Sequence, residues 1–125
     1  MNRHSQYAFY GSLMKGMDNH MLYERHLKFL GEVQLEGFKM FALKDYPYVI
    51  RSNDFNHKIV AELYKVIDIK TEQSIYEMEL DEGYIFSEVE IAGNKFGIYV
   101  FDSHVSNSNE IMSGDWRSYI KSQRF

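Results

Sequence analysis

The sequence predicts an α+β fold in which several antiparallel strands are interrupted by short helices. Ten tyrosines and nine phenylalanines in a chain of 125 residues favour a β-rich core or an aromatic-walled pocket over a plain helix bundle. Segments in which apolar and polar residues alternate are followed along the chain by segments whose apolar residues have helical spacing. The chain contains no internal repeat and no low-complexity tract. At this length, residues 1–125 are expected to form one domain with one core.

The chain is predicted to begin with a strand followed by a helix. The aromatic residues within 7–10 indicate a short strand. A helix is expected from a cap at residue 18 or 19 to about Leu30, because apolar residues such as Phe29 share one face at helical spacing. Gly31 would then be the stop signal of this helix.

Three further strands are predicted in the middle of the chain. Residues 32–43 alternate between apolar and polar side chains, and Gly37 marks a bulge or a turn between two strands. Residues 45–48 contain the only proline and are expected to form a loop, and residues 59–66 alternate again as a strand.

The last third is predicted as helix, hairpin, loop and helix. Thr71 is expected to cap a helix over about 72–81, and residues 87–101 to form a hairpin around a glycine-containing turn. Residues 102–112 are rich in serine and asparagine and are expected to be a mobile loop. Asp115 is a suitable cap for a final helix.

Composition excludes several classes of function. The net charge is −4 and no stretch is densely basic, which argues against partners such as nucleic acid or an anionic membrane surface. No cysteine is present, so disulfides, thiolate metal sites and cysteine nucleophiles are excluded. The N-terminus lacks the apolar region of a signal peptide and no apolar run approaches bilayer length, so a cytoplasmic location is expected.

The histidines and serines offer no recognisable catalytic motif. His20 and His26 are six residues apart, and no histidine pair has the i, i+4 spacing of a metal site with a carboxylate partner. No metal and no cofactor are therefore expected, and His26 is interpreted as a core residue on an apolar face. Ser12 lies outside any G-x-S-x-G motif, which disfavours a serine hydrolase.

Two segments could carry chemistry. Glu82 continues the apolar stripe of Ile75 and Met78 at the end of the predicted helix, where it either turns to solvent or is buried with a raised pKa. Spacing alone favours the solvated helix end. In Tyr10-Gly11-Ser12-Leu13, a glycine after a strand allows backbone N–H groups to bind an anion, although a plain turn is the simpler interpretation.

Several segments resemble, in order, the signatures of one family. Residues 9–20 resemble a pattern of Tyr-Gly-(Ser/Thr)-Leu, a basic residue, Gly and then Asn-His. The chain is identified as a member of the gamma-glutamylcyclotransferase-like family, which includes gamma-glutamylamine cyclotransferases and AIG2-like proteins. Four further segments resemble family patterns, in chain order. Residues 37–41 and 46–47 resemble a Gly-aromatic strand and a Tyr/Phe-Pro loop, and residues 59–66 resemble the family strand Val-x-Gly-Glu-Leu-Tyr-x-Val. Residues 78–84 resemble Leu-Asp-x-x-Glu-Gly-Tyr, and Ser-Gly-Asp-Trp at 113–116 is typical near the C-terminus.

The resemblance implies a fold, a reaction and a set of site residues. The fold would be a small mixed β-barrel flanked by short helices. The reaction would convert a small gamma-glutamyl amine or gamma-glutamyl peptide to 5-oxoproline and a free amine, by attack of the substrate's own α-amine and without a metal. Glu82 would be the general acid–base, and Tyr10, Gly11, Ser12 and Leu13 would form the substrate loop.

The chain also departs from the family pattern, which leaves a second function open. Family members often place an arginine shortly after Glu-Gly-Tyr, whereas residues 86–88 here read Phe-Ser-Glu. Met78-Glu79 replaces Leu-Asp, and Ala61 replaces a glycine. The alternative is a member without turnover that binds a small acyl or amino-acid ligand, or a protein partner, in the same cavity. A weaker alternative is another gamma-glutamyl reaction, such as removal of a protecting group.

Overall fold

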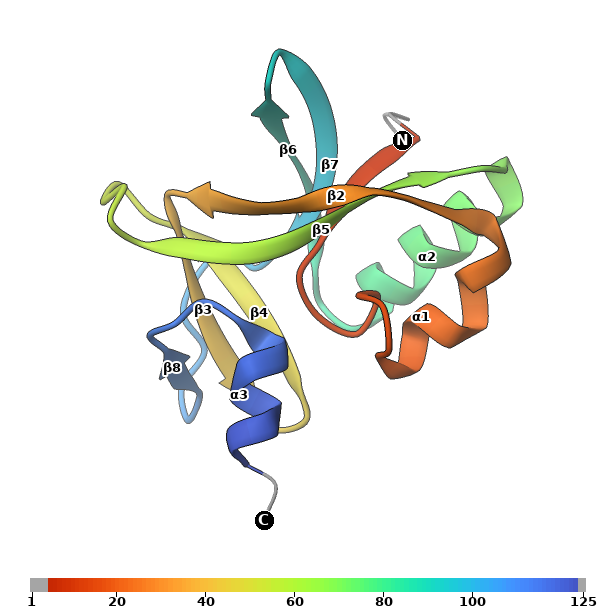
Figure 1. Ribbon diagram of the computed structural model, residues 1–125. Coiled ribbons are helices and arrows are strands. Elements are labelled where there is room, and N and C mark those ends of the chain that lie inside the picture. Colours follow the sequence, from red (N-terminus) through yellow and green to blue (C-terminus); the bar gives the residue numbers. More distant parts are fainter. Residues whose placement is uncertain (1–4, 124–125) are drawn as a thin grey trace.

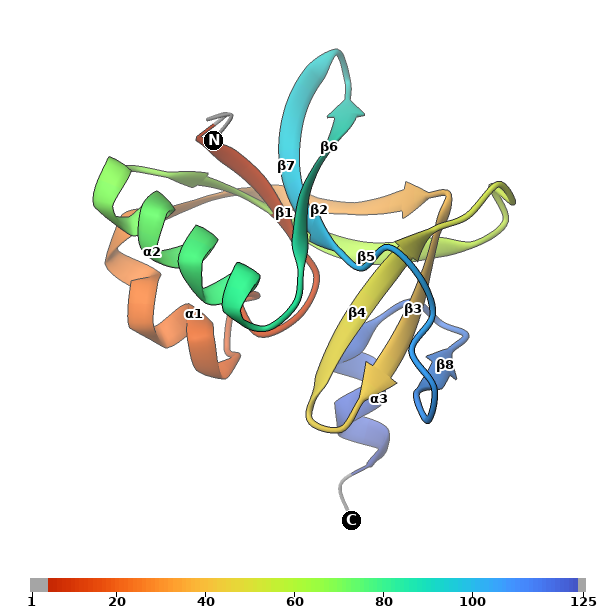
Figure 2. The same ribbon diagram turned by 180° about the vertical axis from the view of Figure 1, so that it is seen from behind.

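The computed structural model describes residues 5–123, whose strands form two sheets (Figures 1 and 2). The larger sheet has the strand order β2-β5-β1-β7-β6 and the smaller β4-β3-β8. The elements are β1 Gln6–Phe9, α1 Asp18–Tyr23, the 3₁₀ turn Glu24–His26, β2 Leu27–Glu36, β3 Phe38–Leu43, β4 Tyr46–Arg51, β5 Lys58–Val66, α2 Ile69–Asp81, β6 Ile85–Ile91, β7 Asn94–Val100, β8 Asn109–Ile111 and α3 Trp116–Ser122.

The α+β class is confirmed, and the sheet is mixed because β1 pairs parallel with β7 and antiparallel with β5. The barrel expected from the family resemblance is not closed. Gly37, with φ of 82°, turns the chain between β2 and β3, and β3 then pairs with β4 and β8 in the second sheet. β2 and β6 therefore remain the two edges of the larger sheet.

The first helix is shorter than expected. α1 ends at Tyr23, and the segment from Leu27 belongs to β2, which pairs with β5 along nearly its whole length. Phe29 is 55% exposed, so the supposed apolar face of a longer helix is not buried. Gly31 is not a helix stop but lies at a register shift of the β2–β5 ladder. Pairing with β5 outweighs a local helical pattern that had no core to cover.

Two segments expected to be loops form strands. Pro47 lies in β4, at the edge of the smaller sheet, where a missing N–H is tolerated. Residues 109–111 lie in the segment expected to be a mobile loop, yet they form β8 and pair with β3. β4 pairs with the adjacent β3 in spite of its proline, whereas the partner of β8 is far away in sequence, so tertiary pairing decides the conformation of β8.

The remaining expectations are largely confirmed. The hairpin of β6 and β7 turns at Ala92 and Gly93, and Asp115 caps α3 by accepting the N–H of Ser118 at 3.2 Å. The cap of α2 is Asp68 rather than Thr71, because the Asp68 carboxylate accepts the N–H of Thr71 at 2.8 Å.

The core lies between the larger sheet, α2 and the smaller sheet, and it is rich in tyrosine. Tyr7, Tyr48 and Tyr64 are among the largest side chains that are fully buried. α1 and α2 lie side by side against one end of the larger sheet, while α3 packs beside the smaller sheet (Figures 1 and 2). The loop that follows β1 passes close to the C-terminal end of α2, and this arrangement positions the site described next.

Candidate active site

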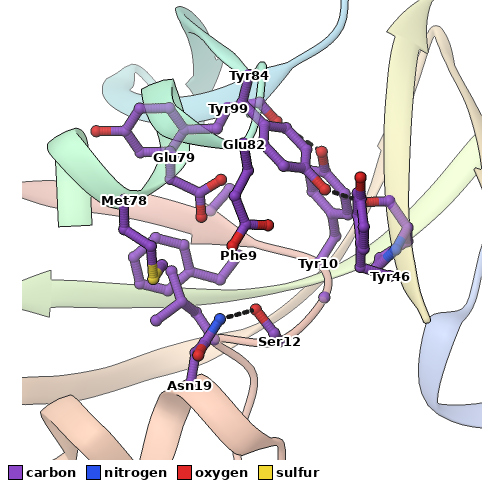
Figure 3. A pocket seen from close by; sticks show the side chains of 14 residues that line it. Phe9, Tyr10, Ser12, Asn19, Tyr46, Met78, Glu79, Glu82, Tyr84 and Tyr99 are labelled. Atoms are coloured by element: carbon purple, nitrogen blue, oxygen red, sulfur yellow. Dashed lines mark hydrogen bonds between the residues drawn. The ribbon is translucent and has the colours of Figure 1, made fainter. Parts of the chain in front are cut away.

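A pocket lies where the loop after β1 meets the C-terminal end of α2 (Figure 3). Its volume, including the open space at the mouth, is about 450 Å³. All five residues predicted to form the site line it. The lining residues are Ala8, Phe9, Tyr10, Gly11, Ser12, Leu13, Asn19, Tyr46, Pro47, Met78, Glu79, Glu82, Tyr84 and Tyr99.

The start of the loop is fixed by close packing against β4. The Tyr10 hydroxyl donates a hydrogen bond to the carbonyl of Tyr99 at 2.6 Å. A Cβ atom added to Gly11 would lie 2.7 Å from Cγ of Pro47, which is closer than van der Waals contact allows. Gly11 is therefore required for this approach of the two backbone segments.

Asn19 and His20 hold the loop from the start of α1. The Asn19 amide donates to the Ser12 hydroxyl at 2.7 Å, as Figure 3 shows, and the His20 N–H donates to the Ser12 carbonyl at 2.9 Å. The His20 ring is buried, with Nδ1 3.0 Å from the carbonyl oxygen of Leu13. The Asn-His pair was noted in the sequence only as part of a motif, and its role in supporting the loop emerges from these contacts.

The loop leaves its own backbone donors unused. Within residues 5–123, none of the backbone hydrogen bonds is donated by the N–H groups of residues 11–13. These three residues line the pocket. Successive N–H groups in a turn can bind a carboxylate or a developing oxyanion.

The C-terminal end of α2 brings two glutamates to the opposite wall. Gly83 has φ of 96°, the Tyr84 N–H donates to the Glu79 carbonyl at 3.0 Å, and the Gly83 N–H donates to the Leu80 carbonyl at 3.1 Å. This is a Schellman motif, in which Glu82 is the C-cap that follows the last residue of the helix. Glu79 and Glu82 are three positions apart and direct their carboxyl groups into the same pocket (Figure 3).

The two carboxyl groups differ in their surroundings. Glu82 is an exposed residue at the mouth of the pocket, so it is not the buried carboxyl that the sequence allowed as one alternative. Glu79 is the more buried of the two glutamates. Burial raises the pKa of Glu79 to about 8, and the nearby charge of Glu82 adds to the increase. Glu79 was noted in the sequence only as a departure from the family pattern, because spacing does not distinguish a partly buried helix position from an exposed one.

Aromatic side chains form most of the remaining wall. The Tyr84 hydroxyl donates to the Pro47 carbonyl, and its ring packs edge-on against Phe101. Burial raises the pKa of Tyr10 and of Tyr84, so both phenols stay neutral near pH 7. None of the described residues that line the pocket is Lys, Arg or His, and the two glutamates are its only acidic side chains.

The buried carboxylate of Glu62 supports the segment that follows the loop. Glu62 lies on β5 opposite Phe9 and is 5% exposed. Its Oε1 accepts the N–H of Lys15 and the hydroxyl of Tyr64, both at 2.8 Å, and its Oε2 is 3.0 Å from the Arg117 guanidinium. The sequence indicated Glu62 only as one residue of an alternating strand that matches a family motif, and its role as a buried acceptor emerges from these contacts.

Two further expectations about side chains are resolved. His26 is not in the core: its side chain is 51% exposed and its Nδ1 lies 2.6 Å from Asp68. Residues 86–88, where the family often has an arginine, lie in β6 and do not line the pocket. The Arg51 guanidinium reaches this strand from β4 and donates to the Ser87 hydroxyl at 2.7 Å.

Two kinds of feature are absent from the described part of the chain. Residues 5–123 contain no group of three or more His, Cys, Asp or Glu side chains suited to hold a metal ion. None of the helices in this range has the length and apolar character needed to cross a bilayer.

The sequence and the fold were compared with known proteins. A family model described as "Gamma-glutamyl cyclotransferase, AIG2-like" matches residues 7–118. The chain is 33% identical over 109 residues to "Putative gamma-glutamylcyclotransferase PH0828" of Pyrococcus horikoshii, which covers 87% of this chain and 88% of that protein. It is 30% identical over 119 residues to "Putative gamma-glutamylcyclotransferase MJ1514" of Methanocaldococcus jannaschii, covering 91% and 98%.

Solved structures agree on the fold. The crystal structure of the Pyrococcus horikoshii protein superposes with a TM-score of 0.79 at 30% identity and covers 94% of each chain. The structure of an AIG2-like protein from mouse superposes with a TM-score of 0.71 and covers 88% of this chain and 87% of that one. Its 18% identity supports a shared fold alone.

Proposed function

The chain belongs to the gamma-glutamyl cyclotransferase, AIG2-like family, and we propose that it converts a small gamma-glutamyl amine or peptide to 5-oxoproline and a free amine. Glu82 is the general acid–base of the proposed reaction, and residues 10–13 are the substrate loop. One observation carries the proposal. The two glutamates at the end of α2 and residues 11–13, whose N–H groups donate no backbone hydrogen bond within residues 5–123, line one pocket.

The polar groups of the pocket suit the two charged groups of such a substrate. A gamma-glutamyl compound carries an α-ammonium group and an α-carboxylate on one carbon. The glutamates offer negative charge to the ammonium group, and the loop N–H groups offer donors to the carboxylate or to the oxyanion formed at the γ-carbonyl. The aromatic walls exclude water around them, which strengthens both interactions.

The proposed reaction begins when Glu82 takes a proton from the α-ammonium group. The neutral amine then attacks the γ-carbonyl carbon of the same molecule, and the new N–C bond closes the ring of 5-oxoproline. The C–N bond to the leaving amine breaks as that nitrogen receives a proton. Since the nucleophile is part of the substrate, the protein supplies mainly positioning and proton transfer, two effects that account for large rate enhancements.

The test is release of 5-oxoproline from a panel of gamma-glutamyl amines and dipeptides by wild type and Glu82→Gln. We expect turnover of at least one compound and a loss of about 10²-fold or more in the variant. Glu77→Gln is the matched control, because Glu77 is an exposed glutamate on the same helix and does not line the pocket. Binding of a panel compound without any release would instead favour a member of the family that only binds its ligand.

A further inference from the structure

We propose that Glu79 is a second proton-transfer group of the site, which acts beside Glu82 during ring closure. The inference rests on the proposed function and adds to it. It starts from the number of protons that the reaction must move. The α-ammonium nitrogen carries three protons and the nitrogen of 5-oxoproline carries one, so two protons pass to the leaving nitrogen, which departs as an ammonium ion.

The position of Glu79 suits this role. It lies one helical turn before Glu82, lines the same pocket, and directs its carboxyl group to the same space (Figure 3). Among the described residues 5–123, no hydrogen bond or ion pair to the Glu79 carboxyl is found. A buried carboxyl with a purely structural role normally has partners, because burial without them is costly.

Burial and the charge of Glu82 on the same helix favour the protonated form of Glu79. The other titratable groups that face it are the phenols of Tyr10 after β1, Tyr84 just before β6 and Tyr99 on β7. None of the described residues that line the pocket is a cation, and the pKa of Glu79 is raised to about 8. Beside Glu82, the free site thus holds a carboxylic acid that can donate a proton near pH 7.

The proton balance then closes with both groups restored. Glu82 accepts a proton from the α-ammonium group, and the amine attacks the γ-carbonyl carbon. The Glu79 acid gives its proton to the leaving nitrogen as the C–N bond breaks, and it regains one from the ring nitrogen. Protonated Glu82 finally transfers its proton to the released amine, which leaves as an ammonium ion.

Kinetics of Glu79→Gln test the assignment, with a substrate that wild type turns over. We expect kcat to fall about 10²-fold while KM changes less than threefold, because the amide keeps the shape of the side chain but cannot donate a carboxyl proton. In wild type, kcat/KM should fall above about pH 8 as Glu79 of the free enzyme ionises, and this limb should be absent from kcat/KM of the variant. Glu79→Asp should restore part of kcat, whereas Glu77→Gln should match wild type. A Glu79→Gln enzyme with wild-type kcat and an unchanged pH profile would overturn the assignment.

A second measurement separates this inference from the proposed function. The carboxyl carbon signal of Glu79 in the ligand-free protein, assigned by its loss in Glu79→Gln, is followed by NMR from pH 3 to pH 10. A midpoint near pH 8 supports a carboxyl that stores a proton, and a midpoint near pH 4 overturns the inference even if the protein is an active cyclotransferase. If no panel compound is turned over, the proposed function fails, and this titration still decides whether Glu79 holds the proton.

Discussion

Replacement of Glu62 is expected to destabilise both the fold and the substrate loop. Glu62 accepts hydrogen bonds from the Lys15 N–H, the Tyr64 hydroxyl and the Arg117 guanidinium. Glu62→Gln keeps the shape of the side chain but removes its charge and replaces one accepting oxygen by an NH₂ group. With the amide oxygen toward the Lys15 N–H and the Tyr64 hydroxyl, these two contacts each weaken by about 1 kcal/mol, because hydrogen bonds to charged groups stabilise by about 1.5–3 kcal/mol and neutral ones by about 0.5–1.5 kcal/mol. The NH₂ group then faces the Arg117 guanidinium, which loses its acceptor.

The net effect is smaller than the sum of the three contacts. The Arg117 side chain is 28% exposed, so water replaces part of what its guanidinium loses. We therefore expect Glu62→Gln to lower the free energy of unfolding by about 2 kcal/mol, and Glu62→Ala by about 3–5 kcal/mol, since the alanine leaves the buried donors without an acceptor. For a chain of this size, 2 kcal/mol corresponds to a decrease in Tm of about 8 °C.

Urea denaturation followed by tyrosine and tryptophan fluorescence measures this free energy. Glu90→Gln is the control, because Glu90 is an exposed glutamate on another strand and its replacement should change stability by less than about 0.5 kcal/mol. Because the Lys15 N–H anchors the end of the substrate loop, KM should also rise in Glu62→Gln. A variant as stable as the Glu90→Gln control would refute the view that the carboxylate holds these elements together.

Three further changes have defined expected outcomes. Gly11→Ala should place a methyl group against the Pro47 ring and destabilise the fold by about 1–3 kcal/mol, with a narrowed pocket; a wild-type Tm would contradict this. Tyr84→Phe removes the donor to the Pro47 carbonyl and should lower the free energy of unfolding by about 1 kcal/mol in urea titrations, whereas an unchanged value would show that the contact contributes little. Because the pKa of Glu79 is raised to about 8 in the folded state, its contribution to stability is fully present below about pH 4 and is lost as the pH rises to 8. Glu79→Gln should therefore be more stable than wild type at pH 8.5 by about 4–5 kcal/mol, because each pKa unit between 4.5 and about 8 corresponds to about 1.4 kcal/mol. It should lose this advantage at pH 4, and a pH-independent difference would argue against the raised pKa.

Local sequence patterns predicted the elements whose stability is largely local. The hairpin turn, the cap at Asp115 and the helix end near residue 81 were all identified, because a turn or a cap depends on the conformation of a few neighbouring residues. Errors arose where a distant partner decided the outcome. Leu27 and its successors left the predicted helix because they pair with β5, more than thirty residues further along the chain.

The candidate site divides in the same way. The order of the motifs was enough to propose Glu82 and residues 10–13 as one site, and the family model matches residues 7–118. Tertiary structure decided which carboxyl is buried and what supports the loop. Glu79 and Glu82 have the same side chain and neighbouring positions, but only the packing of α2 against the larger sheet makes Glu79 a partly buried acid and leaves Glu82 exposed at the mouth. A pKa depends on the surrounding dielectric and on nearby charges, and both are set by residues that are distant in sequence.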